Sequence, residues 1–485
     1  MNKKKNFEEF KFESIIGMGC TANLVHSTKL PPTQYRRAWG AIYDCGFPIV
    51  PNDHWLFGSL NVMKSHSTHW QLGRLTRKYG RTYGLIQGCH PTIVTSDPEI
   101  DPSSSHPDTT YEVHEFAARG ERWKRIRSLT SKAISNENLR KLFYVMQDSV
   151  NRFIMDLENE IIDVKALDLH PYAFYTIIHF WKLSRFQKLT FDIISRCCIG
   201  RPYSCQQDDP NLKLLLKKFS PLQRCLPDLK WISLMCAKLC LRFRAAFHLD
   251  VDPLVTYTDY LRRDRSSFLY FMKCVEDERW NGWTVNADEP CDFSAMKIIQ
   301  KLTPGEIINQ CRFLTLAGFD TTANTAAYLI YLLAKNPMEQ EKLYQEIAVL
   351  DEITFDSVQR LSYLHCAIME TLRLFPHASL LQSRTCVKQC KIGPYTFKEN
   401  VGVIFDTWSL HYDQEIWGND VKQFKPDRFL NCATIQKKNW MAFGAGPRQC
   451  IGMRFAMLEI KIIICSLLKK FRFHKTENMS EFYMQ

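Results

Sequence analysis

The chain has 485 residues, of which 45% are hydrophobic and 24% charged, a balance that excludes a largely disordered or low-complexity protein. The 63 Lys and Arg residues outnumber the 51 Asp and Glu residues and give a formal charge of +12. A basic excess of this size suits an acidic partner protein, an anionic membrane surface or a nucleic acid. We expect no nucleic-acid binding, because no basic run with interleaved aromatic residues is present.

The first half of the chain predicts a small β region followed by helices. Residues 1–50 contain no apolar run long enough for a membrane anchor. Residues 55–58 and 85–95 predict a turn and short strands, and helical periodicity begins at Ala118. We therefore expect residues 51–485 to form one domain of a mainly α fold with a minor β region.

The second half predicts one long helix and several shorter ones. Thr303, Pro304 and Glu306 form a helix start with a capping box, and the helical pattern runs to Lys335. Further helices are predicted at 338–349, 361–375 and from Ile451. The stretch 313–334 is nearly uncharged, but a membrane span there would place Asp320 and four threonines in lipid. The pattern therefore favours a buried core helix.

One of the 18 cysteines lies in a distinctive loop. The others are scattered, without a secretory signal or zinc-ligand spacing, and most of them are expected to be reduced and buried. Cys450 is expected at a helix N-terminus, where N–H groups and the helix dipole favour a thiolate. An incidental buried cysteine in a capping loop is the alternative. The loop residues before and after it are Phe443, Gly444, Gly446, Arg448 and Gly452.

This loop resembles the haem-binding loop of cytochromes P450, Phe-x-x-Gly-x-Arg-x-Cys-x-Gly, with all five fixed positions in register. The resemblance implies the cytochrome P450 fold and a haem b whose iron has Cys450 as its axial thiolate ligand. It also places Phe443, Gly444 and Ala317 against the haem. The implied reaction inserts one oxygen atom from O2 into a lipophilic substrate. A thiolate ligand suits that reaction, because it pushes electron density toward the iron.

An acid followed by a hydroxyl residue at mid-helix is locally unfavourable and indicates a functional site. Asp320 and Thr321 resemble the acid–alcohol pair of the same family. The resemblance gives Thr321 hydrogen bonds to oxygen and ordered water, and Asp320 a proton relay from solvent. The alternative is a buried Asp satisfied locally, with threonines bonded to carbonyls one turn earlier.

Charged residues are expected to form a structural ion-pair cluster and a binding site for the haem propionates. Glu370 and Arg373 lie three apart on one helix face and resemble the buried structural pair of the family, which Arg428 joins. The resemblance also implies that four residues hold the haem propionates, which are carboxylates suited to arginine. They are Trp123, Arg127, Arg384 and Arg448.

The resemblance also implies a pocket and partners. Phe313 and residues 377–380 would line the substrate pocket, with His377, Ala378, Ser379 and Leu380 following the third helix. Electrons would come from an NADPH–cytochrome P450 reductase, and the details are closest to the animal microsomal branch that oxidises xenobiotics and steroids. That branch places the protein at the endoplasmic reticulum membrane, on its cytosolic face.

Three departures from the family leave other functions open. No anchor is visible, only 24 residues separate Pro98 from Trp123, and the aromatic-rich stretch 168–185 is expected to be an insertion. The short segment predicts a partly lost roof over the haem pocket. One alternative is a haem-dependent isomerase or dehydratase that needs no reductase. Another is a degenerate haem-binding protein without enzymatic activity.

Overall fold

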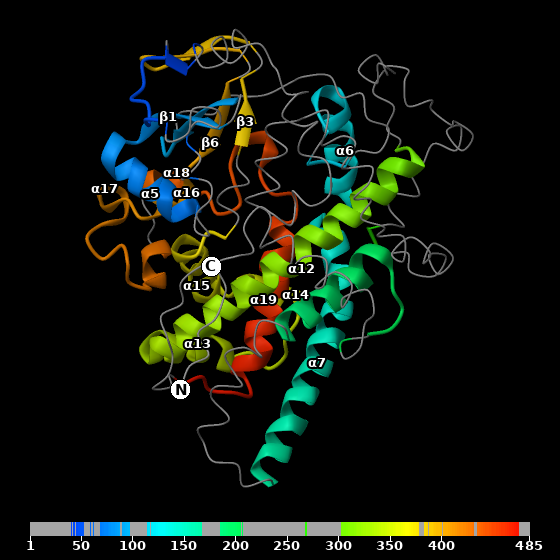
Figure 1. Ribbon diagram of the computed structural model, residues 1–485. Helices are drawn as coiled ribbons and strands as arrows, with labels where there is room; N and C mark the ends of the chain where they lie inside the picture. The colour runs from blue at the N-terminus through cyan, green and yellow to red at the C-terminus, as the bar shows by residue number, and fades with distance from the viewer. Residues whose placement is uncertain are drawn as a thin grey trace, which may run out of the picture.

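The structure is a computed structural model, and it is mostly helical (Figure 1). It describes residues 40, 42–43, 45–52, 59, 62, 68–87, 90–97, 114–116, 118–166, 185–204, 206, 267–268, 302–377, 383–386, 388–399, 401–430 and 434–474. Residues 99–113 and 117 of the short segment before Trp123 fall outside the described residues, as do residues 168–184 and Ala378, Ser379 and Leu380.

The central helix is α12 (Pro304–Lys335), which crosses the molecule diagonally in Figure 1. It begins as predicted, because the Thr303 side chain accepts from the Glu306 N–H and the Glu306 carboxylate accepts from the Thr303 N–H. Asn336 ends the helix and Pro337 opens the next one, α13 (Pro337–Ala348). The prediction of a buried core helix is confirmed, since most apolar residues of α12 are buried.

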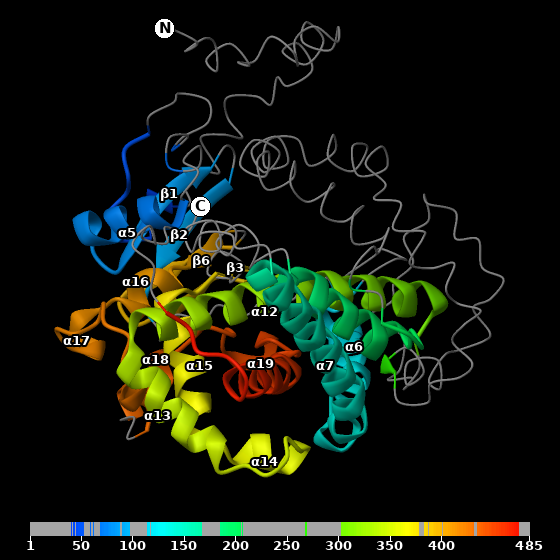
Figure 2. The ribbon, with the colours of Figure 1, turned by 90° about the horizontal axis from the view of Figure 1, so that it is seen from below.

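The other long helices pack around the C-terminal helix α19 (Met453–Leu468), which lies among them in Figure 2. Its neighbours include α7 (Asn136–Ala166), α12, α14 (Phe355–Arg360) and α15 (Ser362–Leu374). Ile462, Ile463 and Ile464 are successive residues and all fully buried, so α19 is buried around most of its circumference in this part of the helix. Among the described residues, no helix is both long and apolar enough to cross a membrane.

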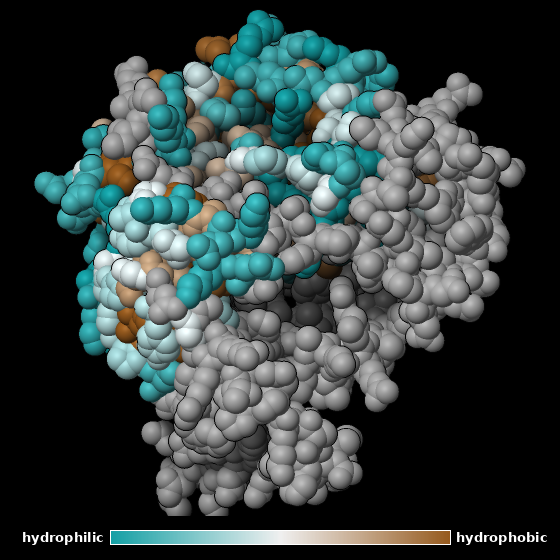
Figure 3. All heavy atoms as spheres, turned by 90° about the horizontal axis from the view of Figure 1, so that it is seen from above, coloured by the Kyte–Doolittle hydropathy of each residue, from teal (hydrophilic) through white to brown (hydrophobic). Residues whose placement is uncertain are grey.

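The small β region lies beside the helices and carries part of the candidate site. Strands β1 (Thr82–Gln87) and β2 (His90–Thr95) pair antiparallel, and β2 pairs in parallel with β6 (Gly402–Phe405). Strand β3 (Ser383–Thr385) completes the sheet, and β4 (Cys390–Ile392) and β5 (Tyr395–Phe397) form a separate hairpin. Helix α5 (Thr68–Tyr79) packs against β1. Figure 3 shows that hydrophilic residues dominate the described part of one face.

Candidate haem site

The cysteine loop is folded tightly by two glycines with positive φ. Gly444 has φ 75° and Gly446 has φ 71°, a conformation that side-chain-bearing residues rarely adopt. The Gly444 N–H donates to the Met441 carbonyl over 2.9 Å, and the Cys450 N–H donates to the Phe443 carbonyl over 2.8 Å. The loop therefore returns on itself and presents Cys450 three residues before α19 begins.

The Cys450 side chain is exposed to solvent although protein atoms crowd it. Burial raises the pKa of its thiol, while the N–H groups of Gly452 and Met453 act in the opposite direction. The helix N-terminus alone thus does not make the thiolate that the sequence predicts. Coordination to a metal ion would do so, because a coordinating thiol is deprotonated outright. A sulfur atom that protein atoms surround but that remains open to solvent on one side can coordinate the metal ion at the centre of a large cofactor.

Arg448 ties the cysteine loop to the segment before α6 (Gly120–Ala133). Its guanidinium donates to the Glu115 carbonyl over 3.1 Å and to the Ala118 carbonyl over 2.7 Å. The same group lies 4.3 Å from the centre of the Trp123 ring. A guanidinium over an indole is a favourable cation–π contact. Arg448 and Trp123, which are 325 residues apart in sequence, are thus in direct contact.

Several positive charges converge at this place. Burial lowers the pKa of Arg448 to about 10, and repulsion from Arg384, Arg119 and Arg127 adds to this effect. Arg448 still carries its charge at neutral pH. The Trp123 Nε1 is buried and has no hydrogen-bond partner among the described residues. Clustered arginines and an unpartnered N–H donor suit an anion, and the two carboxylates of haem fit this arrangement.

Glu115 is a site residue that the sequence analysis missed. Its carboxylate accepts from Arg127 over 2.6 Å, its N–H donates to the Gln310 side chain of α12, and its carbonyl accepts from Arg448. Burial raises the pKa of the Glu115 carboxyl, and its hydrogen bond and charge interaction with Arg127 oppose the rise. The same two charges act on the pKa of the Cys450 thiol, which Glu115 raises and Arg127 lowers. No periodicity marks Glu115 in the sequence, because its contacts are all made by distant residues.

The start of α12 is fixed to α6 by a second cluster that the sequence analysis missed. Arg122 and Arg125 both donate to the Glu306 carboxylate, over 2.8 Å and 2.6 Å. Burial would raise the pKa of Glu306, but hydrogen bonding and the two arginine charges outweigh it and leave the pKa lowered. Glu306 therefore caps α12 and positions α6, the helix that carries Trp123 and Arg127.

The acid–alcohol pair lies at the middle of α12. The Thr321 hydroxyl donates to the Ala317 carbonyl over 2.8 Å, so its oxygen remains available as an acceptor. The Asp320 carboxylate accepts from the side-chain amides of Gln187 and Asn324, over 2.8 Å and 3.2 Å. Both side chains thus make local hydrogen bonds, as the alternative of a locally satisfied Asp and a threonine bonded to the preceding turn predicts.

Two adjacent small residues of α12, Ala317 and Gly318, have different surroundings. A Cβ at Gly318 would lie 3.1 Å from the Ile194 side chain, so this glycine admits the helical residues 185–194. Ala317 is exposed although it lies at the centre of a buried helix.

Two of the predicted pocket residues are described, Phe313 on α12 and His377 beside it. Phe313 stacks on His114, with ring centres 4.5 Å apart, and on Phe116. His377 is near Tyr328, and burial lowers its pKa while the charge of Asp320 acts to raise it. Phe313 is therefore close to Glu115, and His377 is close to the acid–alcohol pair.

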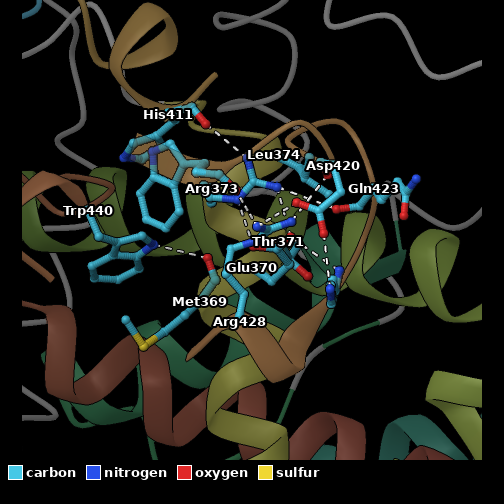
Figure 4. Close-up of polar contacts among 12 residues, drawn as sticks. Met369, Glu370, Thr371, Arg373, Leu374, His411, Asp420, Gln423, Arg428 and Trp440 are labelled. Carbon is cyan, nitrogen blue, oxygen red and sulfur yellow. Dashed lines mark hydrogen bonds and ion pairs between the residues drawn. The ribbon is translucent and has the colours of Figure 1, made fainter. Parts of the chain in front are cut away.

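Glu370, Arg373 and Arg428 form a buried cluster (Figure 4). Arg373 donates twice to the Glu370 carboxylate, over 2.7 Å and 2.8 Å, and both side chains are fully buried. Arg428, in the 3-10 helix η7 (Pro426–Phe429), lies 3.4 Å from Glu370 and also pairs with Asp420. A bidentate ion pair with further hydrogen bonds is the geometry that makes a buried pair tolerable.

His411 connects this cluster to the cysteine loop. Its carbonyl accepts from Arg373 over 2.9 Å, and its Nε2 accepts from the Met441 N–H over 2.9 Å. Since Nε2 accepts, the neutral ring carries its hydrogen on Nδ1. Burial lowers the pKa of His411 to about 3, and the positive charge of Arg373 contributes.

The low pKa of His411 predicts a pH-dependent stability. The unfolded chain, with an ordinary His pKa of 6.5, binds a proton that the folded chain excludes. The free energy of unfolding should therefore be unaffected above pH 6.5 and should fall as the pH drops below it, by up to about 1.4 kcal/mol per pH unit. His411→Gln keeps an acceptor without titrating and should flatten this slope. Urea unfolding between pH 7 and pH 5 measures it, and equal slopes in both proteins would contradict the prediction.

Comparisons with known proteins agree with these features. The sequence model of the family described as "Cytochrome P450" matches residues 48–484. Two similar curated proteins, both from Caenorhabditis elegans, are "Putative cytochrome P450 CYP13A2", 32% identical over 86% of each chain, and "Putative cytochrome P450 CYP13A8", 33% identical over 86% of this chain and 87% of the relative. The predicted fold class is confirmed, as is a haem cofactor held by a cysteine thiolate. The chain belongs to the cytochrome P450 family of haem-thiolate monooxygenases.

Proposed function

We propose that this chain inserts one oxygen atom from O2 into lipophilic substrates, with electrons from NADPH delivered by a flavoprotein reductase. The observation that carries the proposal is the accessible Cys450 sulfur beside a cluster of arginines and the unpartnered Trp123 Nε1. Haem, when bound, supplies the activation of O2. The basic excess of the chain favours docking of an acidic reductase.

In this proposal Cys450 is the iron ligand, and Phe443, Gly444 and Ala317 contact the haem. Trp123, Arg127, Arg384 and Arg448 hold its carboxylates. The buried cluster of Glu370, Arg373 and Arg428 maintains the fold on the haem side and takes no part in the chemistry. Residues 51–485 form the haem-binding domain. We place the protein at the endoplasmic reticulum membrane, facing the cytosol, by family alone.

Thr321 and Asp320 favour oxygenation over the reductase-independent isomerase or dehydratase. The Thr321 hydroxyl oxygen can accept a hydrogen bond while its own hydrogen is held by the Ala317 carbonyl. It would order water beside the oxygen that is being reduced, and Asp320, held by two amides, would pass protons toward it. Phe313, on α12 two turns before Thr321, and His377, beside α12, would contact the substrate.

Thr321→Val is expected to lower the product formed per NADPH consumed by at least about 10-fold, because it removes a group that orders protons. The control is Thr325→Val, which removes a hydroxyl that donates to the Thr321 carbonyl one turn away. Product formation and NADPH consumption are measured in the presence of the reductase with two probe substrates, an alkoxycoumarin and a steroid.

Two outcomes would contradict the proposal. One is an equal loss in the Thr321→Val and Thr325→Val proteins, which would deny Thr321 its special role. The other is conversion of a lipid hydroperoxide without reductase or NADPH, combined with no oxidation of either probe in their presence. That second result would favour the isomerase or dehydratase.

A further inference from the structure

Two cysteines outside the haem site face each other near strand β3. Cys386 directly follows β3, and Cys390 is the first residue of β4. Their sulfur atoms are 3.9 Å apart. Both belong to a small hydrophobic cluster beside the four-stranded sheet, and Cys386 is buried whereas Cys390 is partly accessible. Among the described cysteines, Cys390 and Cys450 are the two that are not buried.

We propose that Cys386 and Cys390 are a reversible, hydroperoxide-sensitive dithiol that closes to a disulfide. A disulfide needs the two sulfurs to approach to about 2 Å, and rotation of both side chains supplies part of the remaining distance. The backbone allows the rest. Among the described strands, β4 pairs only with β5, in a hairpin separate from the four-stranded sheet, so it can shift without breaking the ladder that holds β3.

The different surroundings of the two thiols set the order of the reaction. Cys390 is the accessible sulfur, so its thiolate attacks one oxygen of hydrogen peroxide, the O–O bond breaks, and a sulfenic acid and hydroxide form. The sulfur of Cys386 then attacks the sulfenic sulfur, the S–O bond breaks, and the second oxygen leaves as water. In total, two thiols are oxidised by two electrons and one peroxide is reduced to two waters.

Cys386 is suited to the second step and not to the first. Burial raises the pKa of its thiol to about 11, and its sulfur lies 3.1 Å from the Lys388 carbonyl, so it stays protonated. A protonated, buried thiol is a poor target for peroxide in solution. It can still react with a sulfenic sulfur that forms next to it, because the two sulfurs are held 3.9 Å apart and the thiol proton passes to the departing hydroxide to form water. Reduction by a small thiol such as glutathione would enter through the accessible Cys390 and reverse the reaction.

Peptide mapping of the haem-loaded full chain tests the proposal. Trypsin cleaves after Arg384, Lys388 and Lys391, so the two cysteines fall in separate peptides, residues 385–388 and 389–391. The protein is treated with a small excess of hydrogen peroxide, quenched with catalase, blocked with N-ethylmaleimide under denaturing conditions and digested. We expect the two peptides to be joined by a disulfide, with a mass equal to the sum of the two reduced peptides less two hydrogen atoms. Treatment of the oxidised protein with glutathione before blocking should restore the two separate peptides.

Variants assign the steps and exclude other partners. Cys390→Ser should leave Cys386 fully reactive with the maleimide after peroxide, and Cys386→Ser should stop at a Cys390 sulfenic acid that dimedone traps. Cys45 lies in the same hydrophobic cluster but in a different tryptic peptide. The proposal is overturned by a bridge between Cys386 and Cys45, by a Cys390 sulfenic acid that persists in the unmodified chain, or by two thiols that stay reduced while peroxide oxidises Cys450.

Discussion

Replacing Arg373 with methionine is expected to lower the free energy of unfolding by about 3–5 kcal/mol. The substitution leaves the fully buried Glu370 carboxylate without its bidentate partner. Arg428 remains near Glu370, but at 3.4 Å and with its guanidinium shared with Asp420, it replaces only part of the lost interaction. Arg373 also donates to the His411 carbonyl, so the support of the cysteine loop is lost with it.

The measurement is urea unfolding of the wild type and the variant, with a surface ion pair as control. Arg140 and Asp356 form a bidentate pair at comparable distances, but both side chains are more than half exposed. Arg140→Met should therefore leave the unfolding midpoint almost unchanged, because solvent screens such pairs. Equal effects of the two substitutions would show that burial of the Glu370 cluster does not set its contribution.

The second large effect is expected for haem affinity. Arg448→Met keeps the apolar bulk of the side chain and removes the charge that lies over Trp123. Loss of a charge-assisted contact with a haem carboxylate, together with the bonds to Glu115 and Ala118, should weaken haem binding by about 10- to 100-fold. Transfer of haem from the protein to an excess of a haem-scavenging apoprotein measures the loss as a faster release.

Trp123→Phe provides the graded comparison, because it removes the unpartnered Nε1–H and keeps a ring beneath Arg448. We expect a weaker effect, about 10-fold. Circular dichroism establishes that both variants are folded. Unchanged haem release in both folded variants would contradict the assignment of this cluster to the haem carboxylates.

Local chemistry explains which parts of the fold the sequence predicts well. The capping box at Thr303 and the proline after Asn336 mark both ends of α12, because caps and prolines act within one helical turn. The strands around residues 85–95 and the helix after Ala118 were also predicted, with shifts of a few residues at their ends. The final helix begins at Met453, two residues later than expected, since Ile451 and Gly452 form a turn.

The site was less predictable, because long-range contacts decide it. The Glu115 carbonyl accepts from Arg448, which lies 333 residues later in the chain, and no pattern in the sequence around Glu115 predicts this contact. His411 looks like an ordinary residue of a short helix until its ring is found to accept from Met441. Glu306 was predicted as a cap, but its two arginine partners come from a helix far away in sequence. Motifs identify the chemistry of such residues, whereas packing selects their partners.

The most direct test of the central claim is the absorption difference spectrum of the reduced, carbon-monoxide-bound protein. If Cys450 is the thiolate ligand of a haem held in this fold, the wild type should show a strongly red-shifted Soret band. Cys450→Ala should bind haem more weakly and lack that band, while its circular dichroism stays unchanged. Absence of the band in the wild type despite supplied haem would contradict the account and favour a degenerate relative without oxygenase activity, and persistence of the band in Cys450→Ala would exclude Cys450 as the ligand.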